Sequence, residues 1–479
     1  MLIVTAFWKK LFLCIFFFSF GAHAYTPEAI ADQVTNLPGT EGLSIPFNQF
    51  SGYLHIDGVA QGSMHMHYWY VETSSASSSP EEAPLVLWTN GGPGCSGLFG
   101  MLTELGPFYP NKDKTLSLNP LAWTKLANFL FIESPCGVGF SYSDYESDLY
   151  ASDNSTAMLN YRILQAFYLR FPERINNDLY LASESYGGHY IPILADTILT
   201  QNAFLNSSSL NAISMPLKGF LVGNPYTDTY SAFPAMIETF WGHSLLPKPF
   251  YDVYSSQCLP FVLSDNFSSS LGSMCSSFID KMLNFVGDYN PYGLDFDNCL
   301  EDSSKYHSQR RRLLQHITPR HFPLTYGTNN PCEDNYLHAY LNNLSVKAAL
   351  HVKDSISWSD CSDRISYERN DLSTAPLYTK LLQSNLNLRI LVFSGSDDAV
   401  CSTLGTQRWI FSLPGLTRSS SKYWKVLKLE GQIAGYLTEF TDDRIKFLVV
   451  SGAGHEVPYY TPVAAFDLFQ RFLSWNWTL

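Results

Sequence analysis

Six short apolar runs, spread along the chain, constrain the fold more than any other feature of the sequence. They are residues 84–88, 129–132, 178–182, 219–222, 389–393 and 445–450, and helical stretches such as 153–171 lie between them. Continuous apolar strands that alternate with helices are typical of a mainly parallel sheet covered on both faces. The sequence therefore predicts an α/β protein with such a central sheet, preceded by a β meander at 53–56 and 65–71.

The loop after the third run carries a serine between a predicted strand and a predicted helix at 191–199. Ser185 has small residues two positions before and after it, Ser183 and Gly187. Small neighbours leave room for the strained turn that exposes a nucleophilic serine. The pattern is S-x-S-x-G instead of the usual G-x-S-x-G, so by itself it would also suit an ordinary turn that contains glycine.

The loops after the last two runs carry an acid and a base. Asp397 and Asp398 follow the run at 389–393, and His455 follows the run at 445–450. A hydrolytic serine needs a base, and the base must be held by an acid. The order Ser, Asp, His, with each residue after a core strand, predicts an α/β-hydrolase fold whose loops converge at one sheet edge.

A glycine-rich loop at 90–96 follows the run that ends at Trp88. Its glycines would let backbone N–H groups approach a reacting carbonyl, as an oxyanion hole requires. The loop is therefore the candidate for the remaining part of a hydrolytic site.

Residues 1–24 are typical of a secretory signal peptide. Lys9 and Lys10 precede an apolar stretch at 11–20, and an Ala-His-Ala sequence at 22–24 matches a cleavage site. The stretch is too short for a membrane anchor, and no other stretch approaches about twenty apolar residues. We therefore expect a soluble mature protein without a membrane partner. A net charge of −13 argues against nucleic-acid binding.

Two further observations agree with the secretory route. Nine cysteines are present, and removal of Cys14 with the signal leaves eight, a number consistent with disulfides in an oxidising compartment. Candidate N-glycosylation sequons begin at Asn154, Asn206, Asn266, Asn343 and Asn476.

Residues 226–343 interrupt the alternation of strands and helices. We interpret them as an insertion or cap over the C-terminal edge of a core formed by 25–225 and 344–479. The segment holds four of the eight remaining cysteines and a tribasic sequence, Arg310-Arg311-Arg312. The cysteines disfavour the alternative, a disordered linker.

Several longer stretches are similar to those of a known family. They are WTNGGPGCS at 88–96, ELGP at 104–107, ESPCGVGFSYS at 133–143, ESYGG at 184–188, GNP at 223–225 and GHEVP at 454–458. Across almost the whole mature chain the sequence resembles the serine carboxypeptidases. The resemblance implies Ser185 as nucleophile, Asp398 as acid and His455 as base. It implies an oxyanion hole made of the backbone N–H groups of Gly92 and Tyr186.

The sequence departs from the family pattern in three places. Ser183 replaces a glycine of the serine turn, and Cys136 replaces the usual alanine without an assignable role. The family's G-D-x-D loop has lost its first Asp, because residues 395–398 are GSDD. Val400 and Cys401 support the alignment that makes Asp398 the acid, while a slip of one residue would select Asp397.

The resemblance also implies a subsite for the substrate's terminal carboxylate. Its residues would be Asn90, Gly91, Glu104 and Glu184. Two buried carboxyls close together cannot both ionise cheaply, so at least one pKa should rise. A protonated Glu can donate a hydrogen bond to a carboxylate, and this predicts peptidase activity favoured at acidic pH. Glu456 occupies the position found in plant members that prefer basic residues, so we expect it to favour Lys or Arg.

The same alignment suggests the disulfides Cys95–Cys361, Cys258–Cys275 and Cys299–Cys332, although sequence alone cannot decide a pairing. Related two-chain members lose a linker peptide between the last two cysteines. We hypothesise excision near 305–320, which a single full-length band of the mature protein on a reducing gel would refute.

The predicted function is a serine-type carboxypeptidase that acts on peptide or protein C-termini through an acyl-enzyme. Two alternatives stay open: an acyltransferase that uses the same triad on glucose esters, and a protective binding protein. Retention of Asn90, Glu104 and Glu184 favours the peptidase. We expect no metal or other cofactor, since neither metal-ligand spacing nor a phosphate-binding glycine loop occurs. A homodimer and an extracellular, vacuolar or lysosomal location also remain open.

Overall fold

The computed structural model describes residues 25–478, with gaps at 59–62, 76–77, 208–211, 263–272, 288, 298–332, 370–371, 385 and 418–422. The predicted signal peptide, the sequon at Asn266, the Cys299–Cys332 pair and the predicted excision near 305–320 lie outside the described residues. These predictions stay predictions, as does the glycosylation of Asn206, whose side chain is not described.

The six apolar runs form the parallel centre of one large sheet. In spatial order the strands are β6 (Asn128–Ile132), β3 (Leu85–Thr89), β9 (Leu179–Glu184), β10 (Leu217–Gly223), β12 (Arg389–Gly395) and β15 (Ile445–Val450). Each pairs with the next in parallel. The prediction of a mainly parallel central sheet is therefore confirmed.

Antiparallel strands extend this sheet at both sides. The predicted meander is β1 (Gln49–Ile56) and β2 (Met64–Val71), and β2 pairs with β6 and with the short β7 (Tyr142–Ser143). At the other side β14 (Gln432–Glu439) and β13 (Lys425–Leu429) follow β15. Two small separate sheets pair β4 (Phe108–Pro110) with β5 (Leu116–Leu118), and β8 (Tyr150–Ser152) with β11 (Ser366–Glu368).

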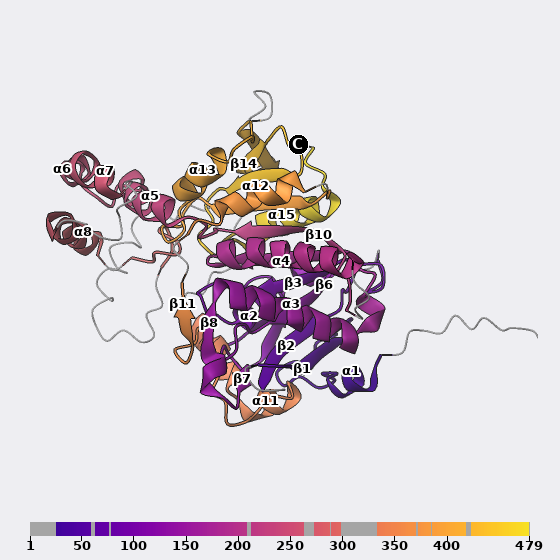
Figure 1. Ribbon diagram of the computed structural model, residues 1–479. Helices are drawn as coiled ribbons and strands as arrows, with labels where there is room; N and C mark the ends of the chain where they lie inside the picture. The colour runs from indigo at the N-terminus through magenta and orange to yellow at the C-terminus, as the bar shows by residue number, and fades with distance from the viewer. Residues whose placement is uncertain are drawn as a thin grey trace, which may run out of the picture.

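Helices cover both faces of the sheet (Figure 1). One face carries α3 (Asp153–Arg170), α4 (Gly187–Ser207), α12 (Ala375–Gln383) and α13 (Thr403–Phe411). The other carries α2 (Gly97–Thr103), α10 (Glu333–Leu341), α11 (Leu344–Ala349) and α15 (Pro462–Ser474). Along β9, Leu179 and Leu181 pack on the first face, while Tyr180 and Ala182 pack on the second. A strand buried on both sides explains why these runs are continuously apolar.

The remaining helices include α1 (Pro27–Ala31), α14 (Val457–Tyr460) and a group within 226–343. That group is α5 (Thr229–Gly242), α6 (Lys248–Val253), a π-helix (Tyr254–Cys258), α7 (Leu259–Val262) and α8 (Ser273–Val286). These helices share a hydrophobic cluster that also includes Ala399. The Cys258–Cys275 disulfide lies within this cluster. In Figure 1, α6, α7 and α8 lie to one side of the sheet and its covering helices.

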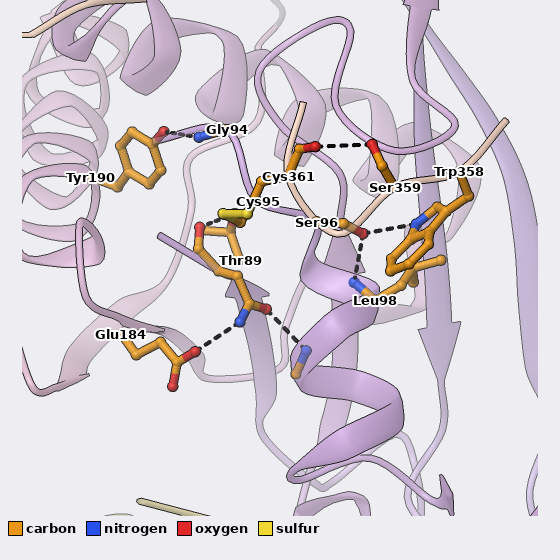
Figure 2. Close-up of a disulfide and its surroundings, with 12 residues drawn as sticks. Thr89, Gly94, Cys95, Ser96, Leu98, Glu184, Tyr190, Trp358, Ser359 and Cys361 are labelled. Atoms are coloured by element: carbon orange, nitrogen blue, oxygen red, sulfur yellow. Dashed lines mark hydrogen bonds between the residues drawn. A yellow bond between two sulfur atoms is a disulfide. The ribbon is translucent and has the colours of Figure 1, made fainter. Parts of the chain in front are cut away.

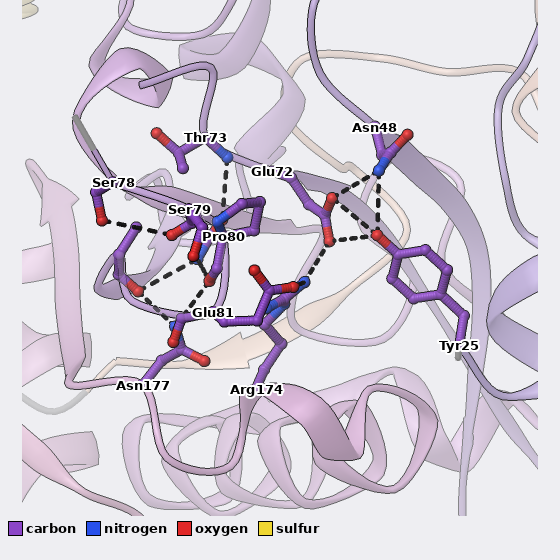
Figure 3. Close-up of polar contacts among 12 residues, drawn as sticks. Tyr25, Asn48, Glu72, Thr73, Ser78, Ser79, Pro80, Glu81, Arg174 and Asn177 are labelled. Atoms are coloured by element: carbon purple, nitrogen blue, oxygen red, sulfur yellow. Dashed lines mark hydrogen bonds and ion pairs between the residues drawn. The ribbon is translucent and has the colours of Figure 1, made fainter. Parts of the chain in front are cut away.

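A buried network around Glu72 links the start of the described chain to the sheet (Figure 3). Arg174, fully buried after α3, donates to Glu72 Oε1 over 2.6 Å. Glu72 also accepts from Tyr25 Oη at 2.9 Å and Asn48 Nδ2 at 2.9 Å. A carboxylate removed from water needs such partners. Glu72 takes them from three segments that are distant in the sequence, those of Tyr25, Asn48 and Arg174.

None of the described helices is both long and apolar enough to cross a membrane.

Candidate active site

Ser185 occupies the turn between β9 and α4. Its φ of 58° is left-handed, an unfavourable conformation for a residue with a side chain and one that is common at functional turns. A Cβ on Gly187 would lie 2.0 Å from Ser183 Oγ, so position 187 has no room for a side chain. Ser183 itself belongs to β9 and donates to the carbonyl of Thr89 over 2.5 Å. The serine that breaks the G-x-S-x-G pattern therefore fits as part of the strand.

His455 and Asp398 form a buried pair in the loops after β15 and β12. His455 Nδ1 lies 2.7 Å from Asp398 Oδ2. The carboxylate also accepts from Asn224 Nδ2 (2.7 Å) and from the backbone N–H groups of Val400 (2.7 Å) and Cys401. These donors hold the carboxylate in one orientation. The carboxylate in turn selects the imidazole tautomer that carries its proton on Nδ1 and leaves Nε2 as the base.

The electrostatics of His455 are dominated by two opposing effects. Burial is the largest single effect and lowers the pKa of the imidazole, but the Asp398 carboxylate and other nearby carboxyls together raise the pKa to about 9. The other carboxyls are those of Glu456 and Glu104. An imidazole stabilised in its charged form suits a base that must hold a proton during a reaction.

Asp397 belongs to a different group of residues. It accepts the backbone N–H of Asp295 at 2.8 Å, and its Oδ1 lies 3.6 Å from His243 Nδ1. Burial and the neighbouring charges of Asp295 and Asp398 raise its pKa. The contact to His455 is thus made by Asp398, the residue that the sequence alignment favours.

His243, Asp295 and Asp397 place potential ligand atoms within 4.8 Å of one another, the one such group in the part of the chain that the structure describes. The three residues are far apart in the sequence, so motif spacing could not reveal the group. Asp397 contacts the other two, through the backbone N–H of Asp295 and through the ring of His243.

The glycine-rich loop between β3 and α2 packs against the serine turn. A Cβ on Gly91 would lie 2.5 Å from the backbone nitrogen of Tyr186, so only glycine permits this approach. Gly92 has a φ of 111°, which also requires glycine. Tyr190, in α4, accepts the N–H of Gly94 at 3.2 Å. The loop that carries Gly92 is therefore held directly beside Tyr186.

A disulfide fastens the other end of this loop (Figure 2). Cys95 bonds to Cys361, as predicted, and Ser96 caps α2 by accepting the N–H of Leu98 at 3.1 Å. Trp358 Nε1 donates to the same hydroxyl at 3.2 Å. The pairings Cys95–Cys361 and Cys258–Cys275 are both confirmed.

Two buried glutamic acids lie next to Ser185. Asn90 Nδ2 donates to Glu184 Oε1 at 2.8 Å, and Asn90 Oδ1 accepts from Trp88 Nε1 (2.8 Å) and from the N–H of Gly100 (3.1 Å). The second acid, Glu104, has Glu184 and Asn90 as neighbours, but its oxygens meet full hydrogen-bond geometry with none of the described residues.

The glutamic acids differ from ordinary carboxyls in their protonation. Burial and the charge of Glu456 raise the pKa of Glu104 to about 8. Burial and the charge of Glu104 raise the pKa of Glu184 well above its ordinary value. Burial disfavours the charged form of both acids, because it removes water that would hydrate the charge.

The serine turn, the glycine-rich loop and His455 border a cavity of about 850 Å³. Asn90, Gly91, Gly92, Glu184, Ser185, His455 and Glu456 line it. The lining also includes residues that the sequence did not predict, among them Phe99, Tyr292, Asp295, Phe296, Asp297, Asp360, Tyr459 and Tyr460. Most come from segments without a recognisable motif, so no local signal pointed to them.

Among the cysteines that the structure describes, Cys136 and Cys401 are free, and each is buried. Burial and the charge of Asp148 raise the pKa of Cys136 to about 12, and burial and Asp398 raise that of Cys401. A thiol that does not ionise is a poor nucleophile, so neither cysteine competes with Ser185.

Three of the predicted glycosylation sites have described side chains. Asn154 and Asn476 are exposed, whereas Asn343 is half-buried and caps α11 by accepting the N–H of Ser345 at 3.0 Å. Exposure suits glycosylation at the first two positions.

Fold and site together define an α/β hydrolase with a serine, a histidine and an aspartate on loops at one sheet edge. Residues 38–475 match the serine carboxypeptidase family. The serine carboxypeptidase-like proteins 26 and 27 of Arabidopsis thaliana are 36% and 34% identical, over 93% and 94% of this chain and 94% of each relative. The chain belongs to the serine carboxypeptidase family, a family of serine-type hydrolases.

A solved structure shares the fold. Kex1(Δ)p, a prohormone-processing carboxypeptidase from Saccharomyces cerevisiae, superposes with a TM-score of 0.73 over 94% of this chain and 97% of that one, at 22% identity. The α/β-hydrolase fold predicted from the sequence is therefore confirmed.

Proposed function

We propose that this protein hydrolyses C-terminal peptide bonds through an acyl-enzyme. The observation that carries the proposal is a pair of buried acids with raised pKa values, Glu104 and Glu184, of which Glu184 accepts a hydrogen bond from Asn90 beside Ser185. A protonated carboxyl donates a hydrogen bond to a carboxylate, whereas an ionised carboxyl repels it. Such a pair next to a nucleophile suits recognition of a free peptide C-terminus.

In this proposal Ser185 Oγ attacks the carbonyl of the last peptide bond, and His455 Nε2 takes the hydroxyl proton. The backbone N–H groups of Gly92 and Tyr186 stabilise the oxyanion. His455 then gives its proton to the departing amino group, and the C–N bond breaks. Water, activated by the same imidazole, hydrolyses the ester that remains on Ser185.

The test uses two N-blocked dipeptides that differ only in a free or an amidated C-terminus. We expect the ratio of free-acid to amide cleavage to be highest below about pH 8, where Glu104 is protonated. As the pH rises through that value Glu104 ionises, so the ratio of free-acid to amide cleavage should fall. His455 titrates in both reactions and cancels in the ratio. A ratio that stays constant with pH would contradict the role of the glutamic acids.

The same assay separates two alternatives. An acyltransferase would move an acyl group from a glucose ester to an acceptor and release little amino acid from either dipeptide. A protective binding protein would turn over neither substrate.

We also propose a preference for basic residues near the cleaved bond. Asp295, Asp297, Asp360 and Glu456 line the cavity, and no Lys or Arg is among its lining residues in the described chain. Several carboxylates around a partly dry cavity attract a cation more strongly than they would in water.

For this preference we expect Glu456→Gln to lower the ratio of kcat/KM values for C-terminal Arg over Leu by about tenfold, the effect of losing one partly desolvated charge pair. Glu430→Gln is a matched control, because Glu430 is exposed in the turn between β13 and β14. Equal rates for Arg and Leu in the unaltered enzyme would contradict the preference.

We place the protein on the secretory route because of its predicted signal peptide and the two disulfides.

A further inference from the structure

A buried aspartate lies behind the serine turn, outside every motif that identified the site. Asp153, the first residue of α3, is 2% exposed. Its Oδ1 accepts from the hydroxyls of Tyr186 (2.9 Å) and Tyr367 (2.8 Å), and its Oδ2 lies 2.9 Å from His189 Nδ1. One carboxylate therefore contacts three donors, two close together in the sequence and one far from them.

Two of the donors, Tyr186 and His189, belong to the serine turn and to the helix that follows it. Tyr186 directly follows Ser185, and its ring stacks on His189 with centroids 4.8 Å apart and planes 12° apart. Asp153 thus holds the Tyr186 side chain by its hydroxyl and, through His189, by its ring. With its side chain fixed at the far end, Tyr186 has little freedom to rotate the peptide that carries its N–H.

The remaining donor, Tyr367, belongs to residues 360–369, a segment that covers the glycine-rich loop and that we call the strap. The N–H of Ser96 donates to Asp360 O at 2.7 Å, and the N–H of Ser362 donates to Gly94 O at 3.0 Å. Ile365 packs directly on Gly94, because a Cβ added to Gly94 would lie 2.4 Å from Ile365 Cδ1. The disulfide at Cys361 fastens one end of the strap.

The other end of the strap is fastened at Tyr367. This residue lies in β11, which pairs in parallel with β8 immediately before Asp153. Its hydroxyl donates to the Oδ1 atom that also accepts from Tyr186. The carboxylate of Asp153 therefore links the strap over the glycine-rich loop to the serine turn.

We propose that Asp153 is a positioning residue that aligns the two halves of the oxyanion hole. It holds Tyr186 directly, and it holds the loop of Gly92 through the strap. The inference rests on the proposed function, because it assigns the oxyanion amides to Gly92 and Tyr186. Preorganised amides act on charge that develops only in the transition state, so misalignment should lower kcat more than substrate binding.

The test is Asp153→Asn, which keeps the shape of the side chain but replaces one acceptor oxygen by a donor. We expect kcat for a blocked dipeptide to fall by about tenfold to a hundredfold, as is typical for residues that orient a catalytic group, with KM almost unchanged. The rate constant for inactivation by a fluorophosphonate should fall by a similar factor, since that reaction uses Ser185 and the oxyanion hole without a peptide.

Asp32→Asn is the matched control. Asp32 accepts from the Tyr68 hydroxyl at 2.6 Å and pairs with Arg170, far from the serine turn. The Asp32→Asn substitution should lower the melting temperature without changing kcat or the inactivation rate. If Asp153→Asn behaves in the same way, Asp153 has a purely structural role and the inference is overturned.

Tyr367→Phe is a second variant in case Asp153→Asn does not fold. It removes one hydroxyl from a half-buried residue of the strap and leaves the Asp153 charge in place. We expect it to lower the inactivation rate several-fold, and no change would overturn the inference. If the unaltered protein reacts with fluorophosphonate but releases no amino acid, the proposed function fails, while the inactivation rates still test Asp153.

Discussion

Ser185→Ala is expected to lower the kcat for amino-acid release from a blocked dipeptide by roughly 10⁴- to 10⁶-fold. The substitution removes the only atom that can form the acyl-enzyme, while the oxyanion hole and the carboxylate site remain. Substrate should therefore still bind, with little change in the dissociation constant measured for a non-hydrolysed peptide. The measurement is amino-acid release below about pH 8, where Glu104 stays protonated.

A second serine in the same turn provides the control. Ser183→Ala removes a hydroxyl of β9 that donates to the carbonyl of Thr89 in β3, and we expect it to leave the backbone conformation of Ser185 unchanged. We expect a small loss of stability, on the order of 1 kcal/mol for one buried hydrogen bond, and nearly full activity. Full activity of Ser185→Ala, or equal losses in the two variants, would refute Ser185 as the nucleophile.

Asp398→Asn is expected to reduce kcat by about 10⁴-fold while leaving the fold intact. Asparagine would present a donor where His455 Nδ1 now meets an acceptor at 2.7 Å. The imidazole would then adopt the opposite tautomer, with its proton on Nε2, and could no longer accept the proton of Ser185. The remaining contacts to Asn224, Val400 and Cys401 explain why the loop should keep its conformation.

Asp397→Asn is the neighbouring control, and it also decides between the two registers that the sequence left open. Asp397 faces Asp295 and His243, so its amide analogue should change kcat by no more than a few-fold. Steady-state kinetics of both variants, with circular dichroism as a check on folding, give the comparison. A large loss in Asp397→Asn with an active Asp398→Asn would assign the acid to Asp397.

The parallel core was predictable because its signals are local. Each central strand, such as β9 or β12, is buried on both faces, and this requirement produces an uninterrupted apolar run. The loops that carry Ser185, Asp398 and His455 follow such runs directly. Parallel strands end at a common edge, so their order along the chain was enough to bring these loops together in the prediction.

Only the tertiary structure shows which of the two adjacent aspartates contacts His455 and how Ser183 fits the serine turn. Two adjacent aspartates satisfy the same sequence pattern, and only their side-chain directions separate the one that meets His455 from the one that meets Asp295. Ser183 is tolerated because the serine turn needs a small residue there, with the positive φ falling on Ser185.

The sequence by itself determined the α/β core, the order of the catalytic residue types and the small-residue turn, because strand burial and backbone sterics act over a few neighbouring residues. Only the tertiary structure decided the lining of the cavity, the raised pKa values of Glu104 and Glu184, and the place of Asp153 behind the serine turn. These properties depend on desolvation and on contacts between segments far apart in the sequence, such as Asp153 and Tyr367, which are 214 residues apart.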